Sequence, residues 1–357
     1  MSITTHRWKI PEDEQELETL KSHPAILQAA AFLKEERLVA FPTETVYGLG
    51  ADATSDKAVK GIFIAKGRPA DNPLIVHIGD PSQLENLAIT LPKVGRELIE
   101  HFWPGPLTLV VHSEGRIAQS VTAGLPTVGV RMPSHPVALA LLKVTGIPIA
   151  APSANRSGRP SPTEADHVWT DLVGRIDGIL DAGPTGVGVE STVLDITVSP
   201  PMLLRPGGIT AESLQQVIGK IQLDPALDSA KLRPRSPGMK YRHYAPKGEV
   251  WLVSGEGTEQ IQSVRAAIKE LQLAGKKVGV LTTEERVTMY NAKWVIPCGR
   301  RSDPASVAQG LYRALRRFDE VGAEVILVET FPEKGILASV MNRLEKAAEG
   351  RIYSPKD

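Results

Sequence analysis

The tetrapeptide Lys66-Gly67-Arg68-Pro69 places a cation on each side of a glycine. Pro69 biases the preceding residue away from helical geometry, so a helix leading into this segment should end near Lys66. Gly67 allows the chain to change direction sharply there. Across such a break the two cations can converge on a polyphosphate, because lysine offers a point charge and arginine a planar fork. The same tetrapeptide also fits a solvated basic helix end, which the helix dipole favours.

Further polar residues follow predicted strands, at the edge where α/β sheets place their ligand sites. Each alone is ordinary turn or capping chemistry. Gathered at one edge, they would form a concave pocket lined by hydroxyl and guanidinium groups. These segments are Pro42-Thr43-Glu44-Thr45, Arg131, Ser153-Ala154-Asn155, Ser191-Thr192 and Arg205-Pro206-Gly207-Gly208. His77 also ends a predicted strand, and a half-buried histidine with a satisfied hydrogen bond would explain it equally well.

Several familiar binding motifs do not occur in the sequence. There is no Gly-x-x-x-x-Gly-Lys-Ser/Thr segment of a P-loop. Gly48-Leu49-Gly50 and Gly186-Val187-Gly188 lack the third glycine of a dinucleotide fingerprint. No His-Glu-x-x-His or Cys-x-x-Cys is present, so nothing predicts a zinc site built from protein ligands. If the chain binds a nucleotide, it does so by another route.

An alternation of strands and helices over residues 24–219 could position the polar residues. Predicted helices cover residues 24–36, 55–66, 94–102 and 136–144, with Ser55 as a helix cap. Predicted strands cover residues 38–41, 74–78, 107–111, 128–131, 147–151, 178–181, 193–196 and 202–204. Val46 to Leu49 fits simple core packing. The pattern predicts an α/β domain built on an open twisted sheet.

The alternation stops near Ile221, and residues 220–247 are interpreted as a linker. This segment is rich in Pro, Arg, His and Tyr, whereas flexible linkers are usually rich in Gly and Ser. A passive tether and a functional segment are both open interpretations. Alternation resumes with predicted strands at 250–253, 277–281 and 324–328 and helices at 258–274, 305–321 and 335–348. Residues 248–352 therefore predict a smaller three-layer α/β domain of Rossmann or flavodoxin type.

Length and composition limit the class of protein. A chain of 357 residues with 42% hydrophobic and 23% charged residues suits a globular protein of two domains. Lys plus Arg (41) equals Asp plus Glu (41), which argues against gripping nucleic acid by bulk charge. The lone Cys298 excludes a disulfide scaffold and is expected to be buried. Because no leader or membrane-spanning run of roughly 20 apolar residues occurs, we expect a soluble cytoplasmic protein without membrane contact.

In their order along the chain, these segments resemble the YrdC-like family in its longer two-domain form. Any one match is weak, but the ordered set covers essentially the whole first domain. The matching stretches are 41–49, 66–69 with 72–74, 102–108, 130–133, 151–155, 190–193 and 204–207. Ser236-Pro237-Gly238-Met239 and His243-Tyr244-Ala245-Pro246 resemble the linker of the long form. The second domain offers much less to match.

The family's members are threonylcarbamoyl-AMP synthases, which are nucleotidyltransferases. The resemblance implies that the amine of L-threonine captures CO2 or bicarbonate as a carbamate, whose oxygen attacks the α-phosphorus of ATP and releases pyrophosphate. A separate transferase would then move the threonylcarbamoyl group to the tRNA adenosine beside the anticodon. Positioning and charge stabilisation should supply most of the catalysis. Mg2+ would accompany ATP on phosphate oxygens and water, without a metal held by protein ligands.

The resemblance also implies roles for individual residues. Those around L-threonine are Thr45, His77, Arg131, Ala151 and Ser191, with Arg131 as the clamp for the carboxylate. Those around ATP are Arg68, Asn72, Thr127, Ser153, Asn155, Ser161, Arg205 and Tyr244. Lys66 and Arg68 are the implied catalytic residues, and Ala151 and Thr127 should act through their backbone groups. Because Tyr244 belongs to the linker, we expect the linker to close over the pocket as a lid that excludes water.

Other functions remain open at this point. A non-catalytic RNA-binding module would share the concave positive surface of the YrdC-like domain. The zero net charge and the lack of basic runs interleaved with aromatics predict no strong direct nucleic-acid binding, however. A carbamoyl transferase related to hydrogenase maturation would carry acylphosphatase and zinc-finger-like segments, and neither is recognisable. The second domain lacks a phosphate-binding fingerprint, which favours a packing or partner-docking role.

Overall fold

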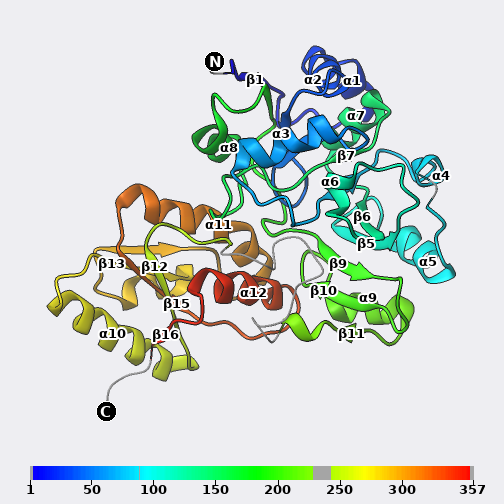
Figure 1. Cartoon of the computed structure of the whole chain (residues 1–357). Coiled ribbons are helices and arrows are strands. Elements are labelled where there is room, and N and C mark those ends of the chain that lie inside the picture. Colours follow the sequence, from blue (N-terminus) through cyan, green and yellow to red (C-terminus); the bar gives the residue numbers. More distant parts are fainter. Residues whose placement is uncertain (1–2, 88, 228–242, 354–357) are drawn as a thin grey trace. The chain divides into compact units, whose positions relative to one another are not determined.

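The computed structural model describes residues 3–87, 89–227 and 243–353. The chain divides into two compact units (Figure 1). The N-terminal unit consists of residues 1–157, 162–186 and 190–240. The C-terminal unit consists of residues 158–161, 187–189 and 241–357. Two short segments of the first part of the chain therefore belong to the C-terminal unit. Most of the long-form linker, residues 228–242, lies outside the described residues.

Within the described residues, the N-terminal unit is built on a mixed sheet of eleven strands. Their order is β1-β8-β2-β3-β7-β4-β6-β5-β9-β10-β11. The strands are β1 (His6–Lys9), β2 (Val39–Phe41), β3 (Gly48–Asp52), β4 (Ile75–His77), β5 (Leu107–His112), β6 (Thr127–Arg131), β7 (Ile149–Ala150), β8 (Gly178–Asp181), β9 (Thr192–Asp195), β10 (Met202–Arg205) and β11 (Gln222–Leu223). The helices are α1 (Leu17–Ser22), α2 (Pro24–Lys34), α3 (Asp56–Lys66), α4 (Gln83–Asn86), α5 (Lys93–Phe102), α6 (Gln119–Thr122), α7 (Pro136–Thr145), α8 (Ala165–Leu172) and α9 (Ala211–Ile218), followed by the 3-10 turn η1 (Pro225–Leu227).

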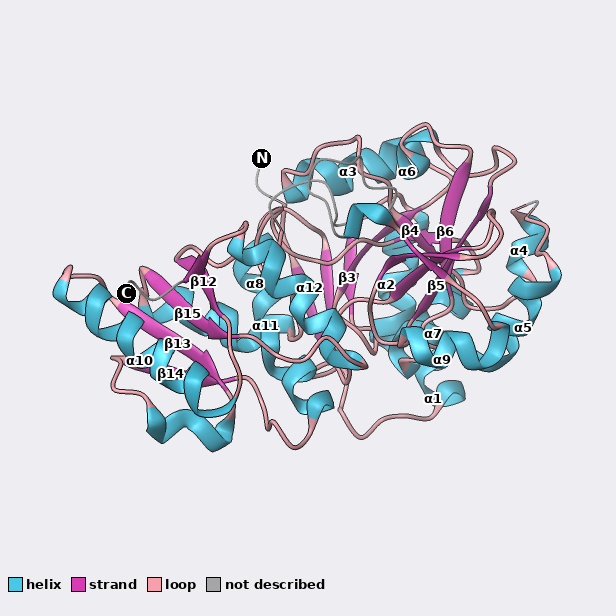
Figure 2. Cartoon of the chain, turned by 90° about the horizontal axis from the view of Figure 1, so that it is seen from below, coloured by secondary structure: helices cyan, strands magenta, loops and turns pink. Residues whose placement is uncertain are grey.

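Alternation along β2 shows how the sheet separates two cores. Val39 and Phe41 pack with helices α1, α2 and α7, whereas Leu38 and Ala40 pack with α3. Successive side chains of a strand point to opposite faces, so each face receives its own helices. Figure 2 shows α3 and α7 on opposite sides of the strands. Each fully buried Leu, Ile or Phe contributes about 1.5–3 kcal/mol, so this packing fixes the sheet edge that carries the polar residues.

The predicted helix over 55–66 is confirmed in detail by α3. The Ser55 hydroxyl accepts the backbone N–H of Ala58 at the helix start. Gly67 closes the helix in the left-handed conformation, with φ of 62°. A left-handed residue costs glycine little, because it has no Cβ to clash with the preceding turn. The chain therefore turns sharply between Lys66 and Arg68, as the tetrapeptide predicts.

Several elements were not predicted from the sequence. Val46 to Leu49 was interpreted as core packing only, but Gly48 begins the short strand β3, which pairs with β2 and β7. Near the N-terminus, β1 adds a parallel edge strand to β8, and α1 precedes α2. Within residues 220–227, β11 pairs with β10. These elements are short and lack a periodic apolar pattern, so tertiary pairing rather than local preference determines them.

In the part of the C-terminal unit that the structure describes, five strands form a sheet, and every strand pair in it is parallel. The strands are β12 (Glu249–Val253), β13 (Val278–Thr282), β14 (Trp294–Pro297), β15 (Val325–Glu329) and β16 (Ile352–Tyr353). The helices are α10 (Gly257–Leu273), α11 (Pro304–Val321) and α12 (Ile336–Ala348), with the 3-10 segment η2 (Glu284–Met289). Val278 and Val280 pack against α10. The intervening Gly279 faces the ring of Phe318 in α11, so the helices cover both faces of the sheet.

The predicted parallel three-layer arrangement is therefore present in the C-terminal unit. Strands β14 and β16 were not predicted, since each is short and lies at an edge of the sheet. The strand order is β14-β13-β15-β12-β16, in which β15 inserts between β13 and β12. Cys298 is buried and free, as expected. Among the described residues, no helix combines the length and apolarity required to cross a membrane.

Candidate active site

Two predicted site residues end neighbouring strands of the N-terminal unit. Strands β4 and β6 run parallel, and their register pairs His77 with Arg131. Both side chains are buried, with 3% and 4% of their surface exposed. Burial, assisted by the nearby Arg131 charge, lowers the pKa of His77 to about 3. The imidazole is therefore neutral near pH 7, and its Nδ1 atom has no hydrogen-bond partner among the described residues.

The guanidinium of Arg131 is held by three groups, which come from two segments of the chain. Its Nε donates to the backbone oxygen of Gly105 at 3.2 Å, and its Nη1 donates to the hydroxyl of Thr45 at 3.0 Å. Its Nη2 lies 2.6 Å from Oε1 of Glu44. Buried cations require such partners, because an unpaired charge away from water is costly. The planar fork of Arg131 is therefore fixed at the sheet edge.

A tight turn after β2 positions both Glu44 and Thr45. The hydroxyl of Thr43 accepts the backbone N–H groups of Thr45 and Val46, each at 3.2 Å. It donates to the backbone oxygen of Val46 at 2.6 Å and lies 2.8 Å from the Thr45 hydroxyl. Threonine side chains commonly stabilise turns through local bonds of this kind. The turn therefore presents Thr45 to Arg131 without depending on a substrate.

Ser191 and Arg205 form a second buried group. The Ser191 hydroxyl lies 2.8 Å from the hydroxyl of Thr108 and accepts from Nη2 of Arg205 at 3.1 Å. Arg205 also donates from Nε and Nη2 to the backbone oxygen of Ser191, at 3.1 and 2.9 Å. Gly207 packs so closely on this segment that an added Cβ would lie 2.3 Å from the nitrogen of Thr192. Backbone proximity explains why the segment contains glycine.

Lys66 anchors the end of α3 to the loop after β7. Its Nζ donates to the backbone oxygen of Asn155 at 2.6 Å and to the backbone oxygen of Ser153. The side chain is 2% exposed, so carbonyl dipoles replace water around the ammonium. Within the same loop, the Ser153 hydroxyl donates to Oδ1 of Asn155 at 2.6 Å. Three predicted residues therefore lie in direct contact.

Arg68 and Asn72 lie beyond the turn at Gly67. Arg68 donates from Nη2 to the backbone oxygens of Asn72 and Pro73, at 3.4 and 3.3 Å. Asn72 is 2% exposed, and its Nδ2 has no hydrogen-bond partner among the described residues. A buried amide donor without a partner is costly in a folded protein, so this group is available for a ligand.

Thr127 and Ala151 do not lie at the end of β6, where Arg131 is found. Thr127 begins β6 and Arg131 ends it, which separates their backbones by about 13 Å along the strand. On the other side of β6, Thr127 pairs with His112 of β5. Ala151 directly follows β7, and its backbone N–H donates to the oxygen of Ile75 at 2.9 Å.

Two further predicted residues belong to the C-terminal unit. Ser161 is 1% exposed, and Tyr244 is 4% exposed. Tyr244 has a φ of 63°, which is unusual for a residue with a side chain, and its ring stacks on that of Tyr312 with 5.6 Å between centroids. Ser236-Pro237-Gly238-Met239, matched above to the long-form linker, lies outside the described residues.

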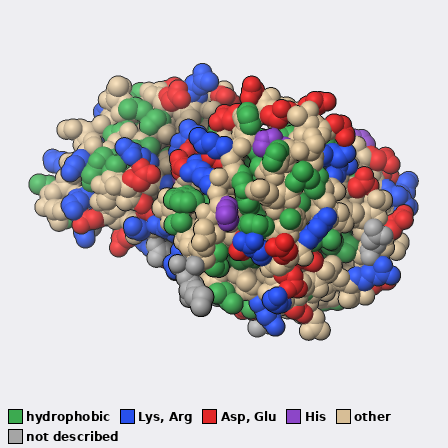
Figure 3. All heavy atoms as spheres, turned by 90° about the horizontal axis from the view of Figure 1, so that it is seen from above, with side chains coloured by type: hydrophobic (Ala, Val, Ile, Leu, Met, Phe, Trp, Pro, Cys, Tyr) green, Lys and Arg blue, Asp and Glu red, His purple; other side chains and the backbone are tan. Residues whose placement is uncertain are grey.

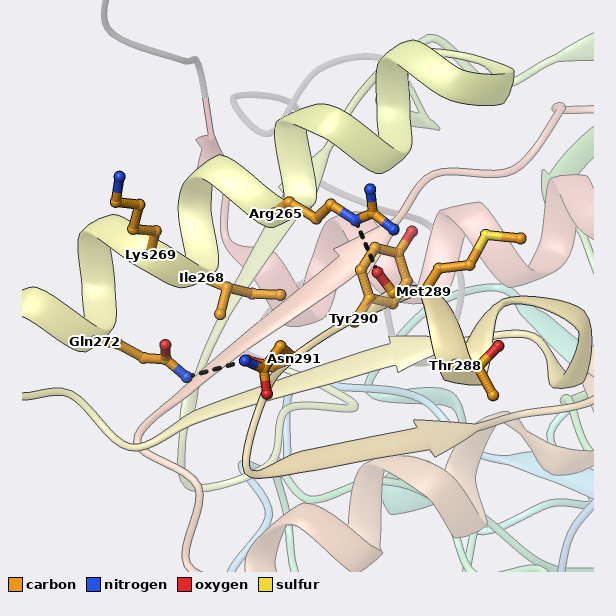
Figure 4. A pocket seen from close by; sticks show the side chains of 8 residues that line it. All are labelled: Arg265, Ile268, Lys269, Gln272, Thr288, Met289, Tyr290 and Asn291. Atoms are coloured by element: carbon orange, nitrogen blue, oxygen red, sulfur yellow. Dashed lines mark hydrogen bonds between the residues drawn. The ribbon is translucent and has the colours of Figure 1, made fainter.

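A separate cleft of about 710 Å3 lies in the C-terminal unit (Figure 4). It runs between α10 and the end of η2, where Arg265 donates to the backbone oxygen of Met289 and Gln272 to that of Asn291. None of the residues predicted from the sequence lines it. Among the described residues of the chain, no group of three or more His, Cys, Asp or Glu side chains is arranged to hold a metal ion.

Sequence reasoning missed Glu44 and Thr108 as members of the site. Glu44 was named as part of a polar turn and of the matching stretch 41–49, and Thr108 only as part of the matching stretch 102–108, without a role for either. A signal for Glu44 existed, because a buried arginine at a strand end requires a nearby acid. Thr108 lies on β5, one strand from β6, and only the sheet order reveals that it meets Ser191.

Comparison with known proteins addresses both units. A family model described as "Telomere recombination" matches residues 31–207, and one described as "Threonylcarbamoyl-AMP synthase, C-terminal domain" matches residues 209–349. A threonylcarbamoyl-AMP synthase of Bacillus subtilis is 54% identical over 98% of this chain and 99% of its own length. The chain belongs to the threonylcarbamoyl-AMP synthase family. A Pyrococcus abyssi member is 50% identical over 91% of this chain and 94% of its own length.

Two solved structures of a relative from Pyrococcus abyssi have the same fold as this chain. A structure of Pyrococcus abyssi Sua5 complexed with L-threonine has a TM-score of 0.88 at 47% identity, with 99% of each chain covered. Another structure of that protein, a double variant, has a TM-score of 0.90 at 46% identity, covering 99% of this chain and 98% of the other. The long two-domain form expected from the ordered motifs is therefore confirmed.

Proposed function

We propose that this synthase binds L-threonine and ATP at the polar edge of the N-terminal sheet and produces threonylcarbamoyl-AMP. The observation that carries the proposal is the buried guanidinium of Arg131, fixed between Thr45 and Gly105 and beside a neutral His77. A buried planar fork at a sheet edge suits a carboxylate. Threonine supplies such a carboxylate together with an amine and a hydroxyl.

The threonine subsite consists of Thr45, His77, Arg131, Ala151 and Ser191. Arg131 would bind the carboxylate, and the orphan Nδ1 of His77 offers one acceptor or donor to the polar groups of the amino acid. Ser191 already lies between Thr108 and Arg205, so its hydroxyl is oriented before the ligand arrives. Preorganised polar groups of this kind lose little entropy on binding.

The ATP subsite draws on the Lys66 loop, on Arg68 with Asn72, and on Arg205. The members that the family resemblance implies are Arg68, Asn72, Thr127, Ser153, Asn155, Ser161, Arg205 and Tyr244. The free amide donor of Asn72 and the cations of Lys66 and Arg68 supply the charge and hydrogen bonds that phosphates require.

The proposed reaction joins three substrates. The ammonium group of threonine first loses a proton, and the neutral nitrogen then adds to CO2, which is supplied as such or formed from bicarbonate and a proton with release of water. This addition gives a carbamate and releases a second proton. A carbamate oxygen then forms a bond to the α-phosphorus of ATP, and the bond to the leaving pyrophosphate breaks. Lys66 and Arg68 would stabilise negative charge on the transferring oxygens. Mg2+, when bound with ATP, would neutralise phosphate charge, and phosphate oxygens and water would be its ligands.

The product is a labile mixed anhydride, which requires protection and a recipient. We propose that the linker, residues 220–247, closes over the pocket and excludes water, and that a separate transferase takes the threonylcarbamoyl group to tRNA. The cytoplasm, where ATP and tRNA are both present, is the proposed compartment. Direct binding of RNA is not part of the proposal. The face drawn in Figure 3 carries acidic side chains among the basic ones rather than one positive field.

Pyrophosphate release from ATP tests the proposal. The full chain is supplied with Mg2+, with and without L-threonine and bicarbonate, and the adenylate is identified by mass spectrometry. Release that requires both co-substrates and yields a product of the threonylcarbamoyl-AMP mass is the expected result. ATP turnover that does not depend on threonine would show that threonine is not the substrate. No turnover by folded protein would favour the RNA-binding alternative, which salt-sensitive RNA affinity would then support.

A further inference from the structure

Glu44 is the acidic partner of Arg131, and it lies within the proposed threonine subsite. The side chain of Glu44 is 13% exposed, and that of Arg131 is 4% exposed. Oε1 of Glu44 lies 2.6 Å from Nη2 of Arg131. Neither atom makes a hydrogen bond among the described residues, so the contact is ionic, with no N–H bond aligned on the oxygen. One carboxylate oxygen and one guanidinium nitrogen therefore both retain hydrogen-bonding capacity.

The second oxygen of Glu44 fixes the orientation of the carboxylate. Oε2 accepts the backbone N–H of Ser134 at 3.1 Å. The neighbouring His135 is partly buried, and burial lowers its pKa to about 4, so it is neutral near pH 7. Arg131 is thus the cation that balances Glu44. The pair has no net charge, and Oε1 is directed to the guanidinium rather than to the Ser134 backbone.

We infer that Glu44 is a specificity-determining residue, which makes the Arg131 subsite select an amino-acid zwitterion over a simple carboxylate. The inference rests on the proposed threonine subsite. A carboxylate that binds Arg131 comes close to Oε1 of Glu44 and is repelled by it. An amino acid brings its own ammonium group, which can donate to Oε1 and offset that repulsion. A neutral ion pair is therefore complementary to a ligand of zero net charge.

Burial makes this discrimination strong. Charges near a protein surface interact several times more strongly than in bulk water, and a carboxylate without an ammonium would leave the subsite with an uncompensated negative charge. Repulsive groups that reject the wrong ligand are a common source of specificity. Glu44 would accordingly weaken the binding of every deaminated analogue of threonine, while it strengthens the binding of threonine itself.

Equilibrium binding of two ligands tests the inference. The ligands are L-threonine and (3R)-3-hydroxybutanoate, which is threonine with hydrogen in place of the amine. Calorimetry on the full wild-type chain should show threonine binding about 100-fold more tightly than the analogue. In Glu44→Gln, which retains the acceptor for Ser134, this ratio should fall to about tenfold or less. Threonine affinity should fall, and analogue affinity should stay equal or rise.

Two further variants keep the test decisive. Glu44→Asp retains the charge and should retain most of the discrimination, even if Glu44→Gln is poorly folded. Asp181→Asn is the matched control, because Asp181 has 12% side-chain exposure and pairs with Arg7 at 2.8 Å on β8 and β1. It should keep the wild-type ratio.

The possible outcomes separate this inference from the proposed function. Threonine binding with an unchanged ratio in Glu44→Gln, or equal losses in Glu44→Gln and Asp181→Asn, would overturn the role of Glu44 alone. A wild-type chain that synthesises threonylcarbamoyl-AMP but does not discriminate against the analogue would do the same. A wild-type chain that binds no threonine would overturn the threonine subsite and the inference with it.

Discussion

The side-chain nitrogen of Lys66 lies 2.6 Å from the backbone oxygen of Asn155, and this contact joins the end of α3 to the loop that follows β7. Both residues are buried, and the loop also carries Ser153. The ammonium is therefore held in a fixed place before any nucleotide binds. A preorganised cation costs no reorganisation at the moment when charge develops on the transferring phosphate.

Replacing Lys66 by methionine should reduce kcat for adenylate formation by about 100-fold or more, which is typical for loss of one preorganised charge-stabilising group. Methionine retains most of the apolar stem, so the fold should persist. Lys60→Met, on the exposed side of the same helix, is the control and should keep wild-type turnover. Pyrophosphate release measures kcat, and near-wild-type kcat in Lys66→Met would contradict the assigned role.

The pH dependence of stability should reveal His77. Its pKa is lowered to about 3 in the folded protein, so between pH 6.5 and pH 3 the unfolded chain binds more protons. The free energy of unfolding is therefore greatest above pH 6.5 and falls as the pH drops, by about 1.4 kcal/mol per unit. Between pH 6.5 and pH 5 the His77 contribution should decrease by about 2 kcal/mol.

Urea unfolding of wild type and His77→Gln at pH 7 and pH 5 measures this contribution. The variant should lose about 2 kcal/mol of the pH dependence. It should keep the part due to His135, whose pKa is also lowered, to about 4. His112→Gln is the control, because that side chain is exposed to water in the folded chain. Identical pH dependence in wild type and His77→Gln would show that the folded imidazole accepts a proton readily.

The sequence predicted the longer helices α2, α3, α5, α7, α10, α11 and α12, because their apolar periodicity and caps are local properties, but it did not predict α1, α4, α6, α8 or α9. Ser55, Gly67 and the break before Pro69 determine the end of α3 without reference to the rest of the chain. Strands β3, β11 and β16 were not predictable in this way, since each is short and depends on a partner distant in sequence. The contact between Ser191 and Thr108 depends equally on the order of strands β5 and β9, which local patterns do not encode.

The site residues show the same limit. Turn and strand-end positions placed Thr45, His77 and Arg131 at one edge of the sheet, as α/β topology suggests. Glu44 is adjacent to Thr45, yet nothing in its local sequence reveals whether it faces solvent or Arg131. Its significance follows from burial, which becomes visible only when the Thr43 turn and β6 are placed side by side.

The buried carboxylate of Glu329 should be essential for the stability of the C-terminal unit. It is fully buried and accepts from Arg286 at 2.9 Å, from Arg301 at 2.7 Å and from the Thr282 hydroxyl at 2.9 Å. Glu329→Gln leaves Arg286 buried without its counter-charge, so the free energy of unfolding should fall by about 3 kcal/mol or more.

Amide hydrogen exchange of strands β13 and β15 in the full chain measures this loss, because their slowest amides report the opening free energy of the unit. Glu320→Gln is the control, since Glu320 forms an exposed pair with Arg317 and should contribute less than about 0.5 kcal/mol. Equal exchange in wild type and Glu329→Gln would mean that the unit tolerates an unpaired Arg286.

Gly207 should be irreplaceable for steric reasons, whereas Gly186 should not. An added Cβ at position 207 would lie 2.3 Å from the nitrogen of Thr192 and 2.4 Å from the oxygen of Glu190, which are backbone atoms that cannot rotate away. Gly207→Ala must therefore displace the Ser191 segment, at a cost of about 1–3 kcal/mol in the free energy of unfolding. Because Arg205 bonds to the Ser191 oxygen, substrate affinity should fall together with the stability.

The control is Gly186→Ala. At Gly186 the atom nearest to an added Cβ is 4.0 Å away, so this substitution should change neither the stability nor the substrate affinity. Urea unfolding and the KM for threonine and ATP measure both effects, and a Gly207→Ala variant with wild-type stability and KM would show that the Ser191 segment is free to move.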